Sequence, residues 1–411
     1  MLTIEEKADK LLSEKELCGH CLGRQFAQLG HGLENYERGK IIRNTEELDE
    51  GSFVQENIPE SAEIGGECKI CKGVFDELDR WLNQLRDSFE RYELETFLIG
   101  IRPREESVRA EEELWEDYGV EWTETLKTEL SRLLGKMVEE ELGVEVDFER
   151  PDIMATVDMR EGRERVELQV NSLLIYAQYN KYSREIPQTE WHCRKCRGSG
   201  CEECDWTGHQ YPTSVQEEIE PSFLRESKAV ESKFHGGGRE DVDAKCLGKR
   251  EFVLELIEPL KRDLDLEELQ EEVNDSTDKV EIFNIEFTHK DKAADIKQKH
   301  ADKEYRAVVE TEDEITKEDL ENNSDVVGEI QQDTPERVEH RRAEKKRIRE
   351  VYEVSWEKTG DKEFELTVKA EAGTYIKELI HGDNGRTQPN ISELIGTPAE
   401  CVQLDVTWIE K

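Results

Sequence analysis

The sequence predicts a multidomain protein of the α+β class. CxxC pairs occur near the start of the chain and again at 193–204, and such pairs are typical of small metal-stabilised modules. Helix-like and strand-like segments alternate between and after these pairs. The 411 residues are enough chain for two or three separate cores. We therefore expect domains over residues 1–75, 76–189 and 190–411.

The segments before residue 189 alternate between the two kinds of regular structure. The chain starts with a charged amphipathic helix, and further helices are predicted over 76–92 and 122–143, the second ended by Gly143. Strand-like runs of apolar residues occupy 95–101, 144–149, 152–159 and 165–182. Beyond the second cysteine group, strands and short helices alternate to the end of the chain.

The composition is strongly acidic. With 57 basic and 99 acidic residues, the formal net charge is −42, and only 35% of the residues are hydrophobic. Such a balance can indicate disorder, but here the apolar residues follow regular patterns. We interpret the charge as the surface of a folded, halophilic protein whose self-repulsion is screened by molar salt. Neither a signal peptide nor an apolar run of the about 20 residues that span a membrane is found, so we expect a cytoplasmic protein.

Eight of the ten cysteines lie in CxxC pairs, which favours metal binding over disulfides in a reducing compartment. Each pair can offer two thiolates, and two pairs close a tetrahedral zinc site. The first site would use Cys18, Cys21, Cys68 and Cys71, and the second Cys193, Cys196, Cys201 and Cys204. The alternatives are unrelated buried cysteines for the first group and a strained or redox-active pair for the second. Iron is an alternative metal. Four thiolates leave no open position, so both sites would be structural.

Two further stretches carry unusual charge. The loop that runs through Gly236–Gly238 presents Glu240, Asp241 and Asp243, where a phosphate-binding loop would avoid acids. It either presents a carboxylate to an uncharged group or caps a turn. A basic strip follows at 337–350, which we interpret as a contact for RNA phosphates or as one solvated helix face. Its basic residues are Arg337, Arg341, Arg342, Lys345, Lys346, Arg347 and Arg349.

Six motifs together resemble the archaeal tRNA pseudouridine-54/55 synthase family. They are CGHCLGRQFAQLG, CRKCRGSGCEECDWTGHQYPTSVQEEI, FHGGGREDVDAKCLG, KEYRAVV, TPERVEHRRAEKKRIREVY and GTYIKELIHGDNGRTQPNISELIG. The resemblance implies an N-terminal zinc module, a THUMP-type α/β domain over 76–189, and a catalytic domain with a mixed, mainly antiparallel sheet. It also implies isomerisation of uridine to pseudouridine in the T loop of tRNA, at positions 54 and 55, without a cofactor for catalysis.

The resemblance assigns roles to individual residues. The family's Gly-Arg-x-Asp motif falls on residues 238–241, which makes Asp241 the catalytic carboxylate and places Arg239 beside the substrate. Tyr305 and Tyr375 match aromatic positions that line the uracil pocket, and Lys377 matches a basic residue paired with the catalytic acid. Asp243, two residues beyond Asp241, would face the opposite way on an extended backbone.

We expect the partner to be tRNA, bound at its T arm and, through the THUMP-type domain, at its acceptor end. The strip at 337–350 would belong to a projecting arm that grips the T arm, and the protein would be a monomer. Two other functions remain open: a zinc-stabilised tRNA-binding protein without catalysis, and another THUMP-containing tRNA modification enzyme. The second would need an S-adenosylmethionine loop or an adenylation loop, and the sequence contains neither.

Overall fold

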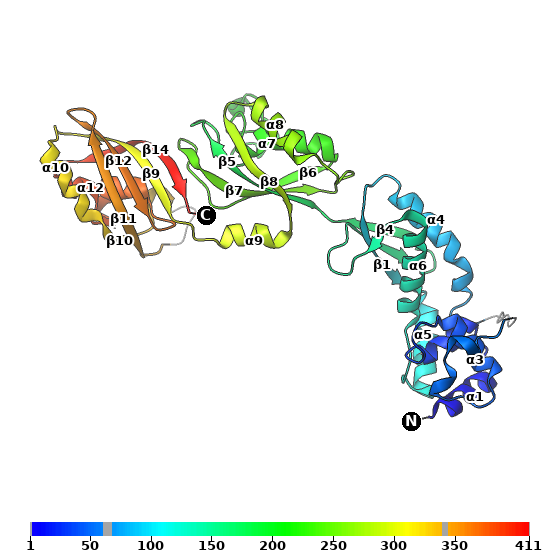
Figure 1. Ribbon diagram of the computed structural model, residues 1–411. Helices are drawn as coiled ribbons and strands as arrows, with labels where there is room; N and C mark the ends of the chain where they lie inside the picture. Colours follow the sequence, from blue (N-terminus) through cyan, green and yellow to red (C-terminus); the bar gives the residue numbers. More distant parts are fainter. Residues whose placement is uncertain (1, 61–67, 339–343, 411) are drawn as a thin grey trace. The chain divides into compact units, whose positions relative to one another are not determined.

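The computed structural model describes residues 2–60, 68–338 and 344–410. The chain divides into two units, one formed by Met1–Asn171 with Leu260–Arg262 and the other by Ser172–Pro259 with Asp263–Lys411. Figure 1 shows the first unit in blue to blue-green and the second in green to red. No helix among the described residues combines the length and apolar character needed to cross a bilayer.

The first unit combines helices with a small mixed sheet. Its sheet has the order β2-β1-β3-β4, with β1 parallel to both neighbours and β4 antiparallel to β3. The strands are β1 Thr96–Arg102, β2 Glu145–Val146, β3 Ile153–Asp158 and β4 Arg165–Val170. The α-helices described there are α1 Ile4–Glu14, α2 Gly19–Gly23, α3 Asn35–Asn44, α4 Leu78–Phe89, α5 Glu105–Tyr118 and α6 Leu126–Leu142.

The helix predicted over 122–143 is confirmed as α6, and its ends have local causes. Thr125 caps the N-terminus, because its side chain accepts a hydrogen bond from the Thr128 N–H. At the other end Gly143 adopts a left-handed conformation with φ of 68°, which costs little without a Cβ. The predicted helix over 76–92 is likewise confirmed as the shorter α4.

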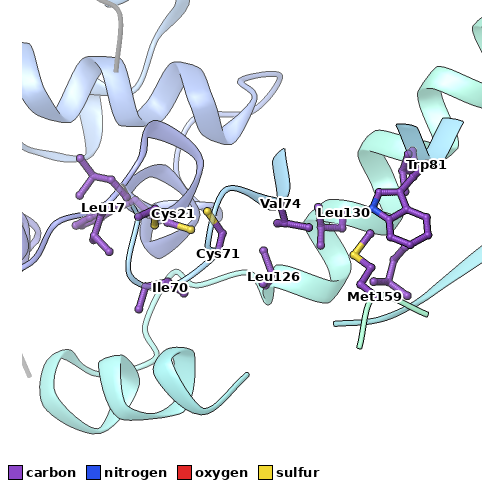
Figure 2. Packing of buried hydrophobic residues seen from close by; sticks show 14 of the residues in the cluster. Leu17, Cys21, Ile70, Cys71, Val74, Trp81, Leu126, Leu130 and Met159 are labelled. Carbon is purple, nitrogen blue, oxygen red and sulfur yellow. The ribbon is translucent and has the colours of Figure 1, made fainter. Parts of the chain in front are cut away.

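One continuous hydrophobic core holds the first unit together. It extends from Ala8 to Met159 and includes both the cysteines of the first group and the sheet. Figure 2 shows Val74, Leu126 and Leu130 lying between the cysteine-bearing segment and Trp81. Leu130 and Trp81 are fully buried. The core therefore continues across residue 75, and the domain limits drawn there and at 189 stay predictions.

The second unit contains a long sheet. Within the described residues it has ten strands, in the order β13-β10-β11-β12-β9-β14-β7-β5-β8, with β6 paired to β7. Only the β14–β7 pair among these is parallel, so the predicted mixed, mainly antiparallel sheet is confirmed. The strands are β5 Leu173–Lys181, β6 Glu231–Gly236, β7 Lys245–Ile257, β8 Val280–Thr288, β9 Lys303–Thr311, β10 Gly328–Gln332, β11 Arg347–Lys358, β12 Glu363–Ala370, β13 Thr387–Gln388 and β14 Ala399–Ile409.

Short helices accompany this sheet. They include α7 Val215–Ser227, α8 Leu266–Ser276, α9 Lys290–Gln298, α10 Lys317–Glu321, α11 Ile376–His381 and α12 Ile391–Ile395. A row of directly opposed residues crosses the middle strands: Cys246 on β7 faces Val406 on β14, and Val406 faces Tyr305 on β9. Because opposed residues in a sheet share a face, this row sets Tyr305 near the start of β7.

The apolar run at 165–182 was predicted as one strand, and that prediction is wrong. It forms β4 in the first unit and β5 in the second. The break falls at Asn171, whose side chain donates a hydrogen bond to the Pro151 carbonyl at 2.6 Å and whose N–H donates to the Asp152 carbonyl. Asn171 is thereby held against the Pro151–Asp152 segment, and β4 ends one residue before it, at Val170.

Candidate active site

The glycine-rich loop connects β6 to β7 and carries Asp241 at its far end. The Asp241 side chain is 41% exposed, and two cations contact its Oδ2 atom. The Arg337 Nη1 atom lies 3.3 Å away and the Lys377 Nζ atom 3.6 Å away. Arg337 belongs to a 3-10 turn, Glu336–Val338, and Lys377 to the first turn of α11. Three segments distant in the sequence therefore meet at one accessible carboxylate.

Asp243 also contacts Lys377, at 2.9 Å, so the expectation that it faces the other way is wrong. The reason is local: the Ala244 N–H donates to the Asp241 carbonyl at 3.1 Å, which closes a turn where an extended backbone was assumed. Burial raises the pKa of Asp243, but the hydrogen bond and charge of Lys377, together with the charge of Lys181 and a backbone hydrogen bond, lower it on balance. Burial lowers and the two carboxylates raise the pKa of Lys377, with a net increase.

A buried carboxylate, that of Glu378, holds Arg337 in this site. Its Nε atom donates to the Oε1 atom of Glu378 at 2.6 Å, and the Glu378 side chain is only 2% exposed. Glu378 follows Lys377 directly in the first turn of α11. Sequence reasoning assigned Arg337 to the RNA-phosphate strip and did not associate it with Asp241. The structure places it between two carboxylates, so one of its roles is to fix the Asp241 side chain.

The neighbour of Asp241 has the opposite environment. The Glu240 side chain is 1% exposed, and its Oε2 atom lies 2.8 Å from the Nε atom of Arg250 on β7. The Tyr179 hydroxyl donates to the same carboxylate at 3.0 Å. Buried charges of this kind need a partner to be tolerated. This pair anchors the loop from inside the protein. A signal was present in the sequence, since Arg250 interrupts an apolar strand-like run.

Lys181, at the end of β5, holds the backbone of the loop. Its side chain is fully buried, and its Nζ atom donates to the carbonyls of Ile186, Asp241 and Val242 at 3.0, 3.1 and 3.0 Å. Burial lowers the pKa of Lys181, and the nearby Glu240 carboxylate offsets part of that effect. An ammonium with three well-placed acceptors fixes the peptide groups on both sides of Asp241. Sequence reasoning missed Lys181, although a lysine in an otherwise buried strand was a visible signal.

The glycines of the loop make room for side chains that approach from the interior. A Cβ atom on Gly236 would lie 2.7 Å from the Gln188 amide nitrogen, and one on Gly238 would lie 2.9 Å from Arg250 Nη1. Gly238 also has a φ of 87°, which disfavours other residues. Gln188 in turn donates to the Gly238 carbonyl at 2.8 Å. Glycines at 236 and 238 therefore leave room for these side chains, and the left-handed backbone at 238 favours glycine there.

The two predicted tyrosines lie on different elements. Tyr305 is on β9, and burial raises its pKa to about 12, with the Asp241 charge adding to the increase. Tyr305 is therefore a neutral phenol at physiological pH. Tyr375 precedes α11, where its backbone N–H and carbonyl both bond to the Gln332 side chain at 2.9 Å. The Arg347 guanidinium lies 5.9 Å from the Tyr375 ring centre.

The remaining predicted substrate and RNA residues are spread more widely. The guanidinium of Arg239 lies over the Trp191 ring, 5.6 Å from its centre, and not against Asp241. On β11, Arg347 donates to Thr334 and Arg349 to Glu371. Lys345 and Lys346 are exposed, while Arg341 and Arg342 lie outside the described residues.

Both cysteine groups have the geometry of a thiolate metal site. The four sulfur atoms of each group lie within 4.8 Å of one another. In the first group the Cys18 and Cys71 sulfurs are 3.6 Å apart, and in the second the Cys201 and Cys204 sulfurs are 3.7 Å apart. Tetrahedral zinc with Zn–S bonds of about 2.3 Å requires S···S distances of about 3.8 Å. Each group can therefore hold a structural zinc ion.

Two family models match the chain. The model described as Pus10, C-terminal, matches residues 174–410, and the model described as Pus10 THUMP domain, archaeal, matches residues 81–158. The chain belongs to the Pus10 family. The C-terminal match of this Pus10 chain contains the whole Asp241 site, including Lys181 and Lys377. The THUMP match lies within the first unit and runs from α4 to the end of β3.

The similarity to curated relatives extends over nearly the whole of this chain and of theirs. The tRNA pseudouridine synthase Pus10 of Methanothermobacter marburgensis is 41% identical over 98% of this chain and 98% of its own length. That of Methanocaldococcus jannaschii is 40% identical over 97% and 93%, and that of Halorubrum lacusprofundi 36% identical over 100% and 97%. A crystal structure of a Cbf5-Nop10-Gar1 complex aligns with 47% of this chain and 45% of its own, at a TM-score of 0.29 and 19% identity, too low to compare folds.

Proposed function

We propose that this Pus10 protein isomerises uridine to pseudouridine in the T loop of tRNA, at positions 54 and 55, with Asp241 as the catalytic carboxylate. The observation that carries the assignment is the pair of cations on Asp241, Arg337 at 3.3 Å and Lys377 at 3.6 Å, around a side chain that stays 41% exposed. The relatives named as tRNA pseudouridine synthases support the reaction. The residue assignment rests on this geometry and on the loop motif.

The reaction makes specific demands that these residues can meet. The bond between N1 of uracil and C1′ of ribose breaks, the base turns, and a bond forms between C5 and C1′. C5 then loses its proton and N1 takes one up, so that the product is an isomer of the substrate. A carboxylate can attack C1′ or take up the proton, and either role requires an accessible oxygen. Arg337 and Lys377 fix the direction of the Asp241 oxygens and leave part of the side chain open to a nucleotide.

The target base has to leave its stack before it can reach Asp241. We propose that Tyr305 stacks on the displaced uracil and that Tyr375 lines the other side of the pocket. With its raised pKa of about 12, Tyr305 stays protonated, so its hydroxyl can donate a hydrogen bond while its ring provides a flat, apolar surface. Arg239 would contact the RNA beside the pocket, from its place over Trp191.

The decisive experiment compares two variants of adjacent acids. Purified protein is incubated with an unmodified tRNA transcript in molar potassium chloride, and pseudouridine is mapped by carbodiimide adducts and primer extension. We expect wild type and Asp243→Asn to modify the T loop, and Asp241→Asn to lose at least about 1000-fold in rate, as expected for a group that acts on the reacting atoms. Transcripts with cytidine at position 54, at position 55 or at both assign the site.

Each outcome of this comparison has a definite meaning. If Asp241→Asn retains activity while Asp243→Asn loses it, the catalytic role belongs to Asp243. If wild type binds the transcript without modifying it, the protein is a tRNA-binding member of the family without catalysis. Binding is measured in the same salt by filter retention, because an acidic chain must bind RNA under conditions where its own repulsion is screened.

We further propose that both four-cysteine groups hold structural zinc and that the protein acts as a monomer in the cytoplasm. We also propose that the THUMP domain contacts the acceptor end and the strip at 337–350 the T arm. Metal analysis of the purified protein tests the zinc sites, and sedimentation tests the monomeric state. Footprinting on full-length tRNA tests the two RNA contacts, and we expect protection of the acceptor end and of the T arm.

A further inference from the structure

A second group of metal-binding side chains lies next to the four-cysteine knot of the second unit. Outside the knot, His192 and His209 form an antiparallel β-bridge. The bridge is part of a short ribbon, since the Cys193 N–H donates to the Gly208 carbonyl at 2.6 Å and the Gln210 N–H to the Trp191 carbonyl at 2.8 Å. Residues directly opposite in such a pair project from the same face. The knot therefore holds two imidazoles side by side.

A carboxylate completes the group. Glu190 precedes His192 by two residues, which returns its side chain to the same face of an extended segment. Its Oε1 atom lies 2.8 Å from the Nδ1 atom of His192 and 2.8 Å from the Nδ1 atom of His209. The three ligand atoms all lie within 4.8 Å of one another. Three side chains from two segments thus converge on one small space.

The contacts of His209 are not those of an ordinary hydrogen bond. Its Nδ1 atom is buried and has no hydrogen-bond partner among the described residues, although the Glu190 oxygen is only 2.8 Å away. The two atoms are close without the alignment that an N–H donor would need. Ligand atoms that share a cation can approach to this distance without a hydrogen bond between them. With metal–nitrogen distances of about 2.0 to 2.1 Å, ligands at right angles lie about 2.9 Å apart.

We propose that Glu190, His192 and His209 bind a divalent transition-metal ion, separate from the ion of the neighbouring four-cysteine knot. Two imidazoles and one carboxylate form a set that suits zinc, iron, nickel or cobalt and is poorly suited to magnesium or calcium. Three protein ligands leave coordination positions for water or for a phosphate oxygen. The His192 side chain is 62% exposed, so these positions open to solvent.

The proposed site is connected to the loop of Asp241. Trp191 lies between two of the ligands in the sequence, and the Arg239 guanidinium packs over its ring. Arg239 is two residues from Asp241 on the same loop. A metal ion that fixes the segment Glu190–His192 would also fix the surface on which Arg239 rests, and the Trp191 fluorescence should report its binding.

The test uses the full-length protein with both four-cysteine groups loaded with zinc. Cobalt(II) is titrated in excess magnesium, which occupies the many surface carboxylates, and binding is followed by absorption and calorimetry. We expect one further equivalent with weak d–d bands and no sulfur charge-transfer band. The variant His192→Ala/His209→Ala should lose more than the about 10- to 100-fold in affinity that removal of a ligand's hydrogen-bonding partner costs.

A matched control and a milder variant keep the test decisive. His300 is exposed and lies outside the group, so His300→Gln removes one imidazole and should bind cobalt as wild type does. Zinc content is measured for every variant. If the double variant loses zinc from its cysteine knot, Glu190→Gln takes its place and should weaken cobalt binding. The proposal is overturned if wild type takes up no further equivalent, or if the ligand variants bind it as tightly as wild type.

Discussion

Glu240 and Asp241 are adjacent acids with opposite environments. Glu240 is 1% exposed and faces the buried Arg250, whereas Asp241 is 41% exposed and faces Arg337 and Lys377. Of these two consecutive residues, Glu240 holds the loop in place and Asp241 is presented to solvent. The Asp241 site therefore has two layers, a buried ionic layer that fixes the backbone and an accessible layer that can meet a substrate.

The largest expected effect is a difference in stability between two variants, in which the carboxylate of either layer is replaced by its amide. Glu240→Gln leaves Arg250 buried without its anionic partner, so we expect a loss of about 3 to 5 kcal/mol in the free energy of unfolding. Asp241→Asn should change stability by less than about 1 kcal/mol, because its partners stay in contact with water. Denaturant unfolding of both variants in molar salt measures the difference.

The stability of Asp241→Asn decides whether the two layers are distinct. If Asp241→Asn destabilises the protein as strongly as Glu240→Gln, the exposed acid is also structural, and its effect on activity cannot be assigned to catalysis. Arg250→Met in the background of Glu240→Gln is the control. It should recover part of the lost stability, because it removes the unpaired charge.

The next effect concerns Lys181, which connects the two layers. Lys181→Met leaves the carbonyls of Ile186, Asp241 and Val242 without their donor, and we expect a loss of about 2 to 3 kcal/mol in stability. The Asp241 backbone also loses its fixed position, so kcat should fall more than KM rises. Steady-state kinetics on the tRNA transcript measure both, at a temperature where the variant is fully folded.

A structural role alone would predict a different result for Lys181. In that case kcat at full folding would equal that of wild type. A kcat that stays low in the folded variant supports positioning of Asp241.

Much of this architecture could be predicted from the sequence, and the exceptions have physical reasons. The helices α4 and α6 follow from apolar periodicity and capping residues, and the type of the second sheet from the family resemblance. The division of 165–182 into two strands does not, because both halves are equally strand-like and only tertiary pairing separates them. The turn at Val242 and Asp243 was missed for a similar reason, since alternation of acids and valine imitates an extended segment.

The site shows the same limit. Asp241, Tyr305, Tyr375 and Lys377 were named from local motifs, and the structure brings Lys377 to Asp241. Arg337 and Lys181 were not connected to Asp241, because their contacts join segments that are 96 and 60 residues apart. Arg250 lies close in sequence, but only the packing of β7 shows that it turns inward to Glu240. Local sequence signals the reactive group, whereas the groups that hold it come from elsewhere in the fold.

Lys377 provides a test of charge in the exposed layer. The net pKa of Lys377 is raised by Asp243 and Asp241, despite burial, so this group stays charged throughout the neutral and mildly alkaline range. In Lys377→His the cation has an ordinary pKa of about 6.5 and is present only below it. We expect kcat of this variant to fall by about 10-fold as pH rises through that range, from loss of a charged hydrogen bond.

The pH profile of wild type should lack this step, and Lys377→Met should be slow at every pH. A pH-independent Lys377→His variant would show that the charge on residue 377 is not required. Rates are measured from pH 5 to 9 at constant salt, so that screening does not change along the series.

The smallest effect should come from Lys345 and Lys346, two residues of the basic strip that lie outside both layers. Lys345 and Lys346 are exposed and directly precede β11. Their positive charge contrasts with the acidic composition of the chain as a whole. If each contacts one RNA phosphate, alanine at either position should reduce the slope of log binding constant against log salt by about 1 and weaken binding to all tRNA sequences alike. Lys317, at the start of α10, is the control, since it lies outside the strip. An unchanged slope would return the strip to the simpler interpretation, a solvated surface, and would leave shape and base stacking as the main sources of affinity.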